Sequence, residues 1–92
     1  MGTNPRVRPQ RLAEKLRYIR TSLDLTQAEL LRQLDIEGLA TQSKISEFES
    51  GKREPSLLIL LQYSRLAGVH MEDLVDDETD LPAKLPAKRT RR

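Results

Sequence analysis

The sequence predicts an all-α protein in which five short helices form one small bundle within 92 residues. Apolar residues recur at helical spacing along most of the chain. Threonine or serine, which can cap a helix N-terminus, begins three of these segments, and glycine or proline follows several of them. The expected helices cover residues 10–23, 26–34, 41–50, 56–67 and 70–75.

Three parts are expected along the chain: a flexible basic arm at residues 1–9, a helical domain at residues 10–76, and a tail at residues 77–92. Pro5 and Pro9 favour an irregular arm, which is either an untethered terminus or an arm that follows a nucleic-acid strand. The tail changes from acidic to basic, and its regularly spaced prolines exclude a regular helix. Its last bases either contact phosphates or keep it solvated, and we expect it to be disordered in isolation.

The first expected helix has one apolar stripe, which is typical of a helix packed against a core. Asp24 and Leu25 connect this helix to the next one. The stripe consists of Leu12, Leu16, Ile19 and Leu23, and the bases off it are Arg11, Lys15 and Arg17.

The second and third helices are short and joined by a turn that contains Gly38. Thr26 and Glu29 form a capping box, in which each side chain binds a free backbone N–H at the helix start. Thr41 can cap the third helix, and Gly51 stands where a left-handed residue ends it. Two helices of about ten residues cannot bury their apolar faces alone, so flanking helices must cover them. These faces carry Leu30, Leu31 and Leu34 in one helix and Ile45 and Phe48 in the other.

The fourth helix is apolar over much of its circumference. Pro55 stops any continuation of the third helix, Ser56 can cap the fourth, and Gly68 ends it. Such a helix is central in the bundle or lies partly in a partner interface. Residues 70–75 then form a brief fifth helix that closes the bottom of the bundle.

The net charge of +2 conceals a division along the chain. Residues 1–20 have six bases and one acid (+5), residues 21–83 have five bases and thirteen acids (−8), and residues 84–92 have five bases and no acid (+5). Nucleic-acid binding would therefore depend on a few placed bases, helix N-termini and the two chain ends. The acidic run at residues 76–80 lacks the glycine and final glutamate of a calcium loop, so we expect a solvated charge run.

Composition and motifs exclude several classes of protein. The chain has no cysteine, which excludes disulfides and thiol chemistry. No apolar run approaches the ~20 residues of a membrane span, and the start of the chain lacks the apolar region of a signal peptide. We therefore expect a soluble, cytoplasmic protein. His70 has no nearby metal-ligand pattern, and no phosphate loop or nucleophile motif occurs, so we expect no metal, no cofactor and no enzymatic activity.

Two stretches resemble one known family. Thr-Gln-Ala-Glu-Leu at residues 26–30 and Lys-Ile-Ser-Glu-Phe-Glu-Ser-Gly-Lys-Arg-Glu-Pro-Ser at residues 44–56 resemble the helix-turn-helix of the Cro/repressor (Xre-type) DNA-binding family. The likeness runs from about Leu12 to Val75 and implies a five-helix lambda-repressor-like bundle. Residues 35–40 hold about four residues more than the family's turn, which either lengthens the turn or adds a helical turn.

The resemblance implies which residues contact DNA. The third helix would enter the major groove, where each base pair presents a distinct pattern of donors and acceptors. Gln42 can bind adenine with two hydrogen bonds, Lys44 can reach guanine or a phosphate, and Glu47 can accept from cytosine. Arg20 would pair with Glu49 through a bidentate fork. The implied base-reading residues are Thr41, Gln42, Ser43, Lys44, Ser46 and Glu47, and the implied phosphate-contacting residues are Gln27, Lys52 and Arg53.

The resemblance therefore implies a sequence-specific transcriptional regulator that binds double-stranded operator DNA. Family members commonly pair as two-fold dimers, so a homodimer on a palindromic site is expected, with the fourth or fifth helix as the candidate contact surface. Two alternatives stay open. One is an antitoxin that binds a toxin partner and represses its own operon. The other is a protein-interaction adaptor without DNA binding, because the same fold serves both purposes and residues 21–83 are acidic.

Overall fold

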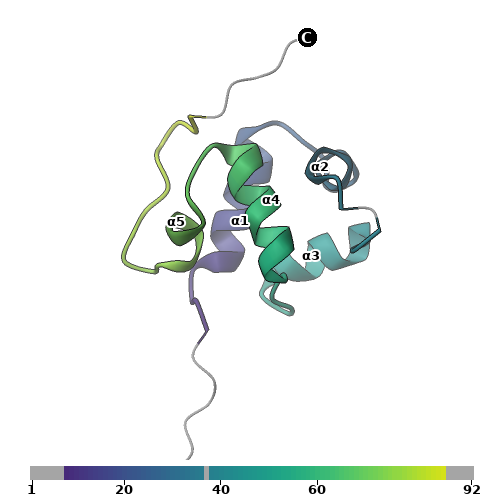
Figure 1. Cartoon of the computed structure of the whole chain (residues 1–92), viewed down its shortest axis with the longest axis horizontal. Helices are drawn as coiled ribbons and strands as arrows, with labels where there is room; N and C mark the ends of the chain where they lie inside the picture. The colour runs from purple at the N-terminus through teal and green to yellow at the C-terminus, as the bar shows by residue number, and fades with distance from the viewer. Residues whose placement is uncertain (1–7, 37, 87–92) are drawn as a thin grey trace, which may run out of the picture.

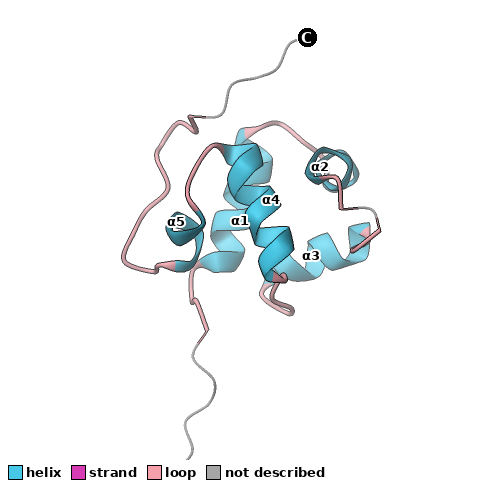
Figure 2. Cartoon of the chain, in the orientation of Figure 1, coloured by secondary structure: helices cyan, strands magenta, loops and turns pink. Residues whose placement is uncertain are grey.

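A computed structural model describes residues 8–36 and 38–86 of the chain. Over these residues the protein is helical, with no strand (Figure 2). The all-α fold with five helices that the sequence predicts is confirmed. The helices are α1 (Leu12–Ser22), α2 (Gln27–Leu34), α3 (Gln42–Ser50), α4 (Leu57–Ala67) and α5 (Met71–Val75).

The helices surround one core, with α1 and α4 in its middle. α4 crosses in front of α1 in Figure 1, while α2 and α3 lie to one side and α5 lies to the other. α1 contacts α3, α4 and α5, and α2 contacts both α3 and α4. All five helices contribute buried apolar side chains to the core, among them Leu16, Ile19, Leu30, Ile45, Tyr63 and Leu74.

Local capping interactions set the helix boundaries. Thr26 Oγ1 accepts the backbone N–H of Glu29 at 3.1 Å, and the Glu29 carboxylate accepts the N–H of Thr26 at 2.8 Å, which confirms the expected capping box. Ser56 Oγ accepts the N–H of Ile59 at 3.4 Å and caps α4 in the same way. Gly51 ends α3 with φ of 82°, a left-handed conformation that costs glycine little.

The connection between α2 and α3 is a long turn in which none of the described residues is helical. Asp35 ends α2 in the left-handed conformation, with φ of 57°. Ile36 and Ala40 are buried in the core, and the Ile36 carbonyl accepts the N–H groups of Leu39 (2.7 Å) and Ala40 (2.9 Å). The two buried residues anchor both ends of the turn, so its length does not detach α3 from the bundle.

Lys15 differs from its expected place off the apolar stripe of the first helix. Lys15 is buried, with only 3% of its surface exposed. A buried ammonium group must be fully hydrogen-bonded to be tolerated, and Lys15 Nζ donates three short bonds to backbone carbonyls in and beyond α5. The acceptors are the carbonyl oxygens of Asp73 (2.8 Å), Asp76 (2.8 Å) and Thr79 (2.7 Å).

The acidic run also differs from the expected solvated run, because Asp77 binds the start of α1. Its carboxylate accepts the backbone N–H of Gln10 at 2.8 Å and that of Arg11 at 3.0 Å. These bonds lower the pKa of Asp77 below its usual value. The partners lie 66 and 67 residues apart along the chain, so no local pattern in the sequence indicates this contact.

Residues 77–85, here called the C-terminal strap, run back along α1. The Tyr18 hydroxyl lies within hydrogen-bond distance of the Pro82 and Ala83 carbonyls, at 2.8 and 2.6 Å. Leu81 and Leu85 are partly buried against the core. The strap is therefore packed on the domain. That the domain ends at residue 76 stays a prediction.

Candidate nucleic-acid interface

The N-terminal edge of α3 lies at the surface, and the opposite side of this helix faces the core. Ile45 and Phe48 are both buried, which sets the rotation of the helix about its axis. Thr41 Oγ1 accepts the N–H of Lys44 at 3.3 Å and so caps the helix start. Among the residues implied to read bases, the exposed ones are Thr41, Gln42, Ser43 and Ser46, and the half-buried ones are Lys44 and Glu47.

Glu47 and Arg53, which the resemblance places in separate roles, form an ion pair. Arg53 Nε donates to Glu47 Oε1 at 2.7 Å. This bond lowers the pKa of Glu47 below its usual value. The backbone N–H groups of Lys52 and Arg53 also donate to the Glu47 carbonyl, at 2.9 and 3.3 Å, which folds the loop back onto the end of α3. The carboxylate of Glu47 is thus balanced by a nearby cation and repels a phosphate less than an isolated acid would.

Glu49 joins α1, α2 and α3 through one carboxylate. Arg20 donates to both Glu49 oxygens, from Nε at 2.7 Å and from Nη2 at 3.0 Å, in the bidentate arrangement that guanidinium and carboxylate favour. Arg20 Nη1 donates to the Leu25 carbonyl at 3.0 Å. Gln27 Nε2 donates to Glu49 Oε1 at 3.3 Å. The side-chain amide of Gln27 is therefore directed at the ion pair, whereas the resemblance implies a phosphate contact for this residue.

The start of the described chain lies beside the loop that follows α3, a proximity that sequence reasoning does not identify. Arg8 Nε donates to Glu54 Oε2 at 3.3 Å. A surface hollow of about 210 Å³ opens between the two segments and is called here the Arg8–Arg53 hollow. Its lining residues are Arg8, Pro9, Gln10, Leu12, Ala13, Gly51, Arg53 and Glu54.

Two further observations bear on the chemistry of the described residues. No group of three or more histidine, cysteine or acidic side chains among them is arranged to hold a metal ion. No helix in the described part of the chain has the length and apolar character to cross a membrane. His70 is exposed at the start of α5, where its backbone N–H donates to Asp73 Oδ2 at 3.0 Å.

Two successive helices joined by a turn, the second with a polar edge at the surface, define the helix-turn-helix class of DNA-binding protein. The model of a family described as Helix-turn-helix matches residues 16–74, which is more than half of the chain. The protein belongs to this Cro/C1-type, Xre-like family of DNA-binding regulators, which are not typically enzymes. A comparison with curated proteins finds no match to the chain.

Proposed function

We propose that the protein is a sequence-specific transcriptional regulator that reads the major groove with the N-terminal edge of α3. The observation that supports this proposal most directly is the exposure of Thr41, Gln42 and Ser43 at a helix start whose opposite side is anchored in the core. A major groove about 12 Å wide admits an α-helix in this way. Because Ile45 and Phe48 fix the rotation of α3, the same edge would meet the bases in every encounter.

The edge of α3 and the loop after it offer side chains of two kinds, which suit bases and phosphates. Gln42 has an amide that can donate to and accept from adenine, and Thr41 has a methyl group suited to thymine. Lys52 is exposed in the loop after α3 and has no base-reading chemistry of its own, so it fits a phosphate. Base readers and phosphate binders should respond differently to mutation.

Selection from random DNA duplexes at two salt concentrations tests the proposal. A regulator that reads sequence enriches a defined site, and its affinity falls steeply as salt rises because phosphate contacts release counterions. An adaptor without DNA binding enriches no sequence. Recovery of random sequences only, at both salt concentrations, would contradict the proposal.

Gln42→Ala is expected to change base preference, while Lys52→Ala weakens every duplex to a similar extent. Loss of a bidentate base contact costs about 1–3 kcal/mol at the base concerned. Loss of a phosphate contact lowers the salt slope by about one and leaves the preferred sequence unchanged. Binding titrations on the selected site and on single-base variants measure both effects. Equal weakening of all duplexes by Gln42→Ala would exclude its role in reading bases.

We also propose that two copies pair through the exposed start of α4. Leu57 is 75% exposed and Leu58 is 62% exposed. Adjacent leucines with this much exposed apolar surface are unusual unless a partner covers them. Leu57 lines an apolar hollow of about 390 Å³ together with Leu12, Leu60 and Val75. A two-fold dimer fits a family that binds palindromic sites, because it presents two reading helices one DNA turn apart.

Leu57→Glu is expected to convert the dimer to a monomer and to reduce binding to the palindrome by more than tenfold. Two buried carboxylates would face each other across a two-fold contact without partners. Sedimentation velocity measures the oligomeric state, and Leu39→Glu is the matched control because Leu39 is also exposed but lies in the turn before α3. The dimer proposal fails if the unmodified chain sediments as a monomer at micromolar concentration. It also fails if Leu57→Glu and Leu39→Glu have the same oligomeric state.

A further inference from the structure

Two arginines from distant parts of the chain face the Arg8–Arg53 hollow. Arg8 comes from the segment before α1, and Arg53 comes from the loop after α3. Gln10 also lines this hollow, and its Nε2 donates to the Arg8 carbonyl at 3.1 Å, which holds the backbone turn that carries Arg8. The Glu54 carboxylate also lines the hollow, so its lining has two positive charges and one negative charge, and this excess of positive charge suits an anion.

Among the described residues, one carboxylate holds each guanidinium through its Nε edge. Arg8 uses Nε to bind Glu54, and Arg53 uses Nε to bind Glu47. In the bonds between described residues, neither arginine uses its terminal nitrogens. Those terminal N–H groups form the fork that binds two oxygens of a phosphate. The carboxylates therefore orient both forks without occupying them.

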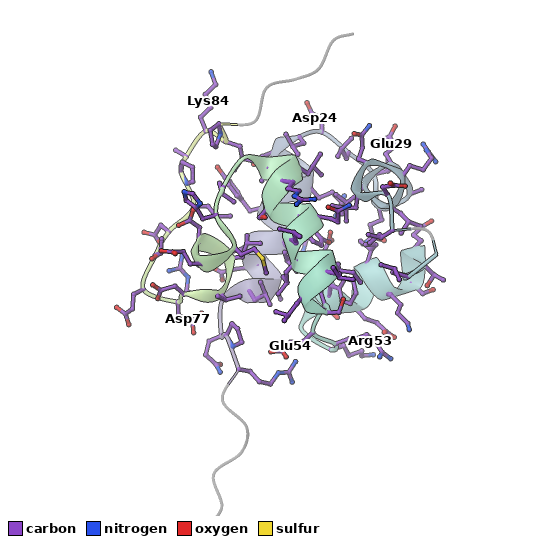
Figure 3. All side chains as sticks on the ribbon, in the orientation of Figure 1. Asp24, Glu29, Arg53, Glu54, Asp77 and Lys84 are labelled. Atoms are coloured by element: carbon purple, nitrogen blue, oxygen red, sulfur yellow. The ribbon has the colours of Figure 1, made fainter. Side chains whose placement is uncertain are left out.

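The hollow lies where a DNA strand would pass if α3 occupies the groove. α3 has nine residues, so its length is roughly 13 Å at 1.5 Å per residue. This length is close to the width of the major groove, about 12 Å. With the N-terminal edge of α3 among the bases, the loop that follows the helix reaches the sugar–phosphate wall. Arg53 and Glu54 lie together at this end of the molecule, and Lys84 of the strap lies at the opposite end (Figure 3).

We propose that the Arg8–Arg53 hollow binds one phosphodiester group of the operator backbone, with Arg8 as a phosphate contact that the resemblance does not imply. This inference rests on the proposed reading of the groove by α3. The phosphate would sit between the two forks and bring the start of α1 and the end of α3 onto the same strand. Arg8 would then position the reading helix relative to the backbone without contributing to base preference.

Arg8→Ala is the test, made on the full chain with the selected operator duplex. The slope of log K against log salt is expected to fall by up to about 0.9 for each protomer bound, because one of the two cations at the phosphate is lost. Affinity at low salt falls roughly tenfold per protomer, and the preferred sequence stays the same. Arg8→Lys is expected to restore the slope but only part of the affinity, because lysine keeps the charge and lacks the fork. Arg65→Ala removes one exposed positive charge from α4, outside the lining of the hollow, and is expected to change neither quantity.

Duplexes with a single neutral methylphosphonate group locate the contact. One position should weaken the unmodified protein strongly and Arg8→Ala less, because Arg53 alone then contacts that phosphate. Thermal unfolding and sedimentation of Arg8→Ala separate this role from a structural one, since loss of the exposed Glu54 pair should leave both nearly unchanged. An unchanged salt slope in Arg8→Ala, with sequence preference intact in the unmodified chain, overturns this inference alone. Failure of the unmodified chain to enrich any sequence overturns the proposed function instead.

Discussion

Replacing Lys15 by methionine is expected to lower the free energy of unfolding by about 3 kcal/mol. Methionine fills a similar volume, so the change removes the ammonium group and little of the packing. Three backbone carbonyls, of Asp73, Asp76 and Thr79, then lose a charged donor at 2.7–2.8 Å. Hydrogen bonds to charged groups contribute more to stability than neutral ones, and buried acceptors without a partner are costly. The end of α5 and the strap should loosen first.

Urea unfolding measures the loss in stability, and amide hydrogen exchange at Gln10 and Arg11 measures the loosening of the strap, because both N–H groups bind Asp77. Arg17→Met on the same helix is the control, since Arg17 is exposed and carries the same charge. Its effect should stay within about 0.5 kcal/mol. Similar stability in the two variants would show that the buried ammonium contributes nothing beyond an ordinary surface charge.

Glu49→Ala is expected to destabilise the fold by about 3 kcal/mol, the cost of leaving a partly buried charge without its partner. The side chain of Glu49 is 6% exposed and that of Arg20 is 16% exposed. The substitution removes both bonds of the fork and the bond from Gln27. The contacts among α1, α2 and α3 would weaken together, because this one carboxylate joins all three.

The neighbouring acid in α3 provides the comparison. Glu47 pairs with Arg53 through one hydrogen bond, and this pair is less buried: the side chain of Glu47 is 36% exposed and that of Arg53 is 51% exposed. Glu47→Ala should therefore change stability by no more than about 1 kcal/mol. The double substitution Arg20→Met with Glu49→Leu should recover most of the loss, since apolar residues of similar volume remove both charges at once. If Glu47→Ala and Glu49→Ala unfold at the same urea concentration, burial does not distinguish the two pairs.

Local patterns in the sequence predict most of the fold. Thr26 with Glu29, Ser56 and Gly51 act on backbone groups no more than a few residues away, so their effects can be predicted without the tertiary structure. The apolar spacing of Ile45 and Phe48 likewise determines which side of α3 faces the core. The exposed edge of α3 follows from that same spacing.

The partners of the charged side chains could not be predicted in the same way. Nothing in the spacing indicates that Arg53 binds Glu47, that Gln27 binds Glu49, or that Arg8 lies beside the loop after α3. A long polar side chain has many rotamers and several candidate partners within reach. Which partner it binds depends on how the helices are placed relative to one another, and the resemblance to a family supplies only some of those pairs.

The sequence by itself determined the helices, their caps and the helix-turn-helix, because these depend on backbone groups and apolar residues that are near one another along the chain. Only the tertiary structure decided that Lys15 is buried and that Asp77 binds the backbone just before α1. A lysine beside an apolar stripe and an aspartate in an acidic run are typical surface residues. Their places inside the fold depend on carbonyl and amide groups that approach from about 60 residues away along the chain.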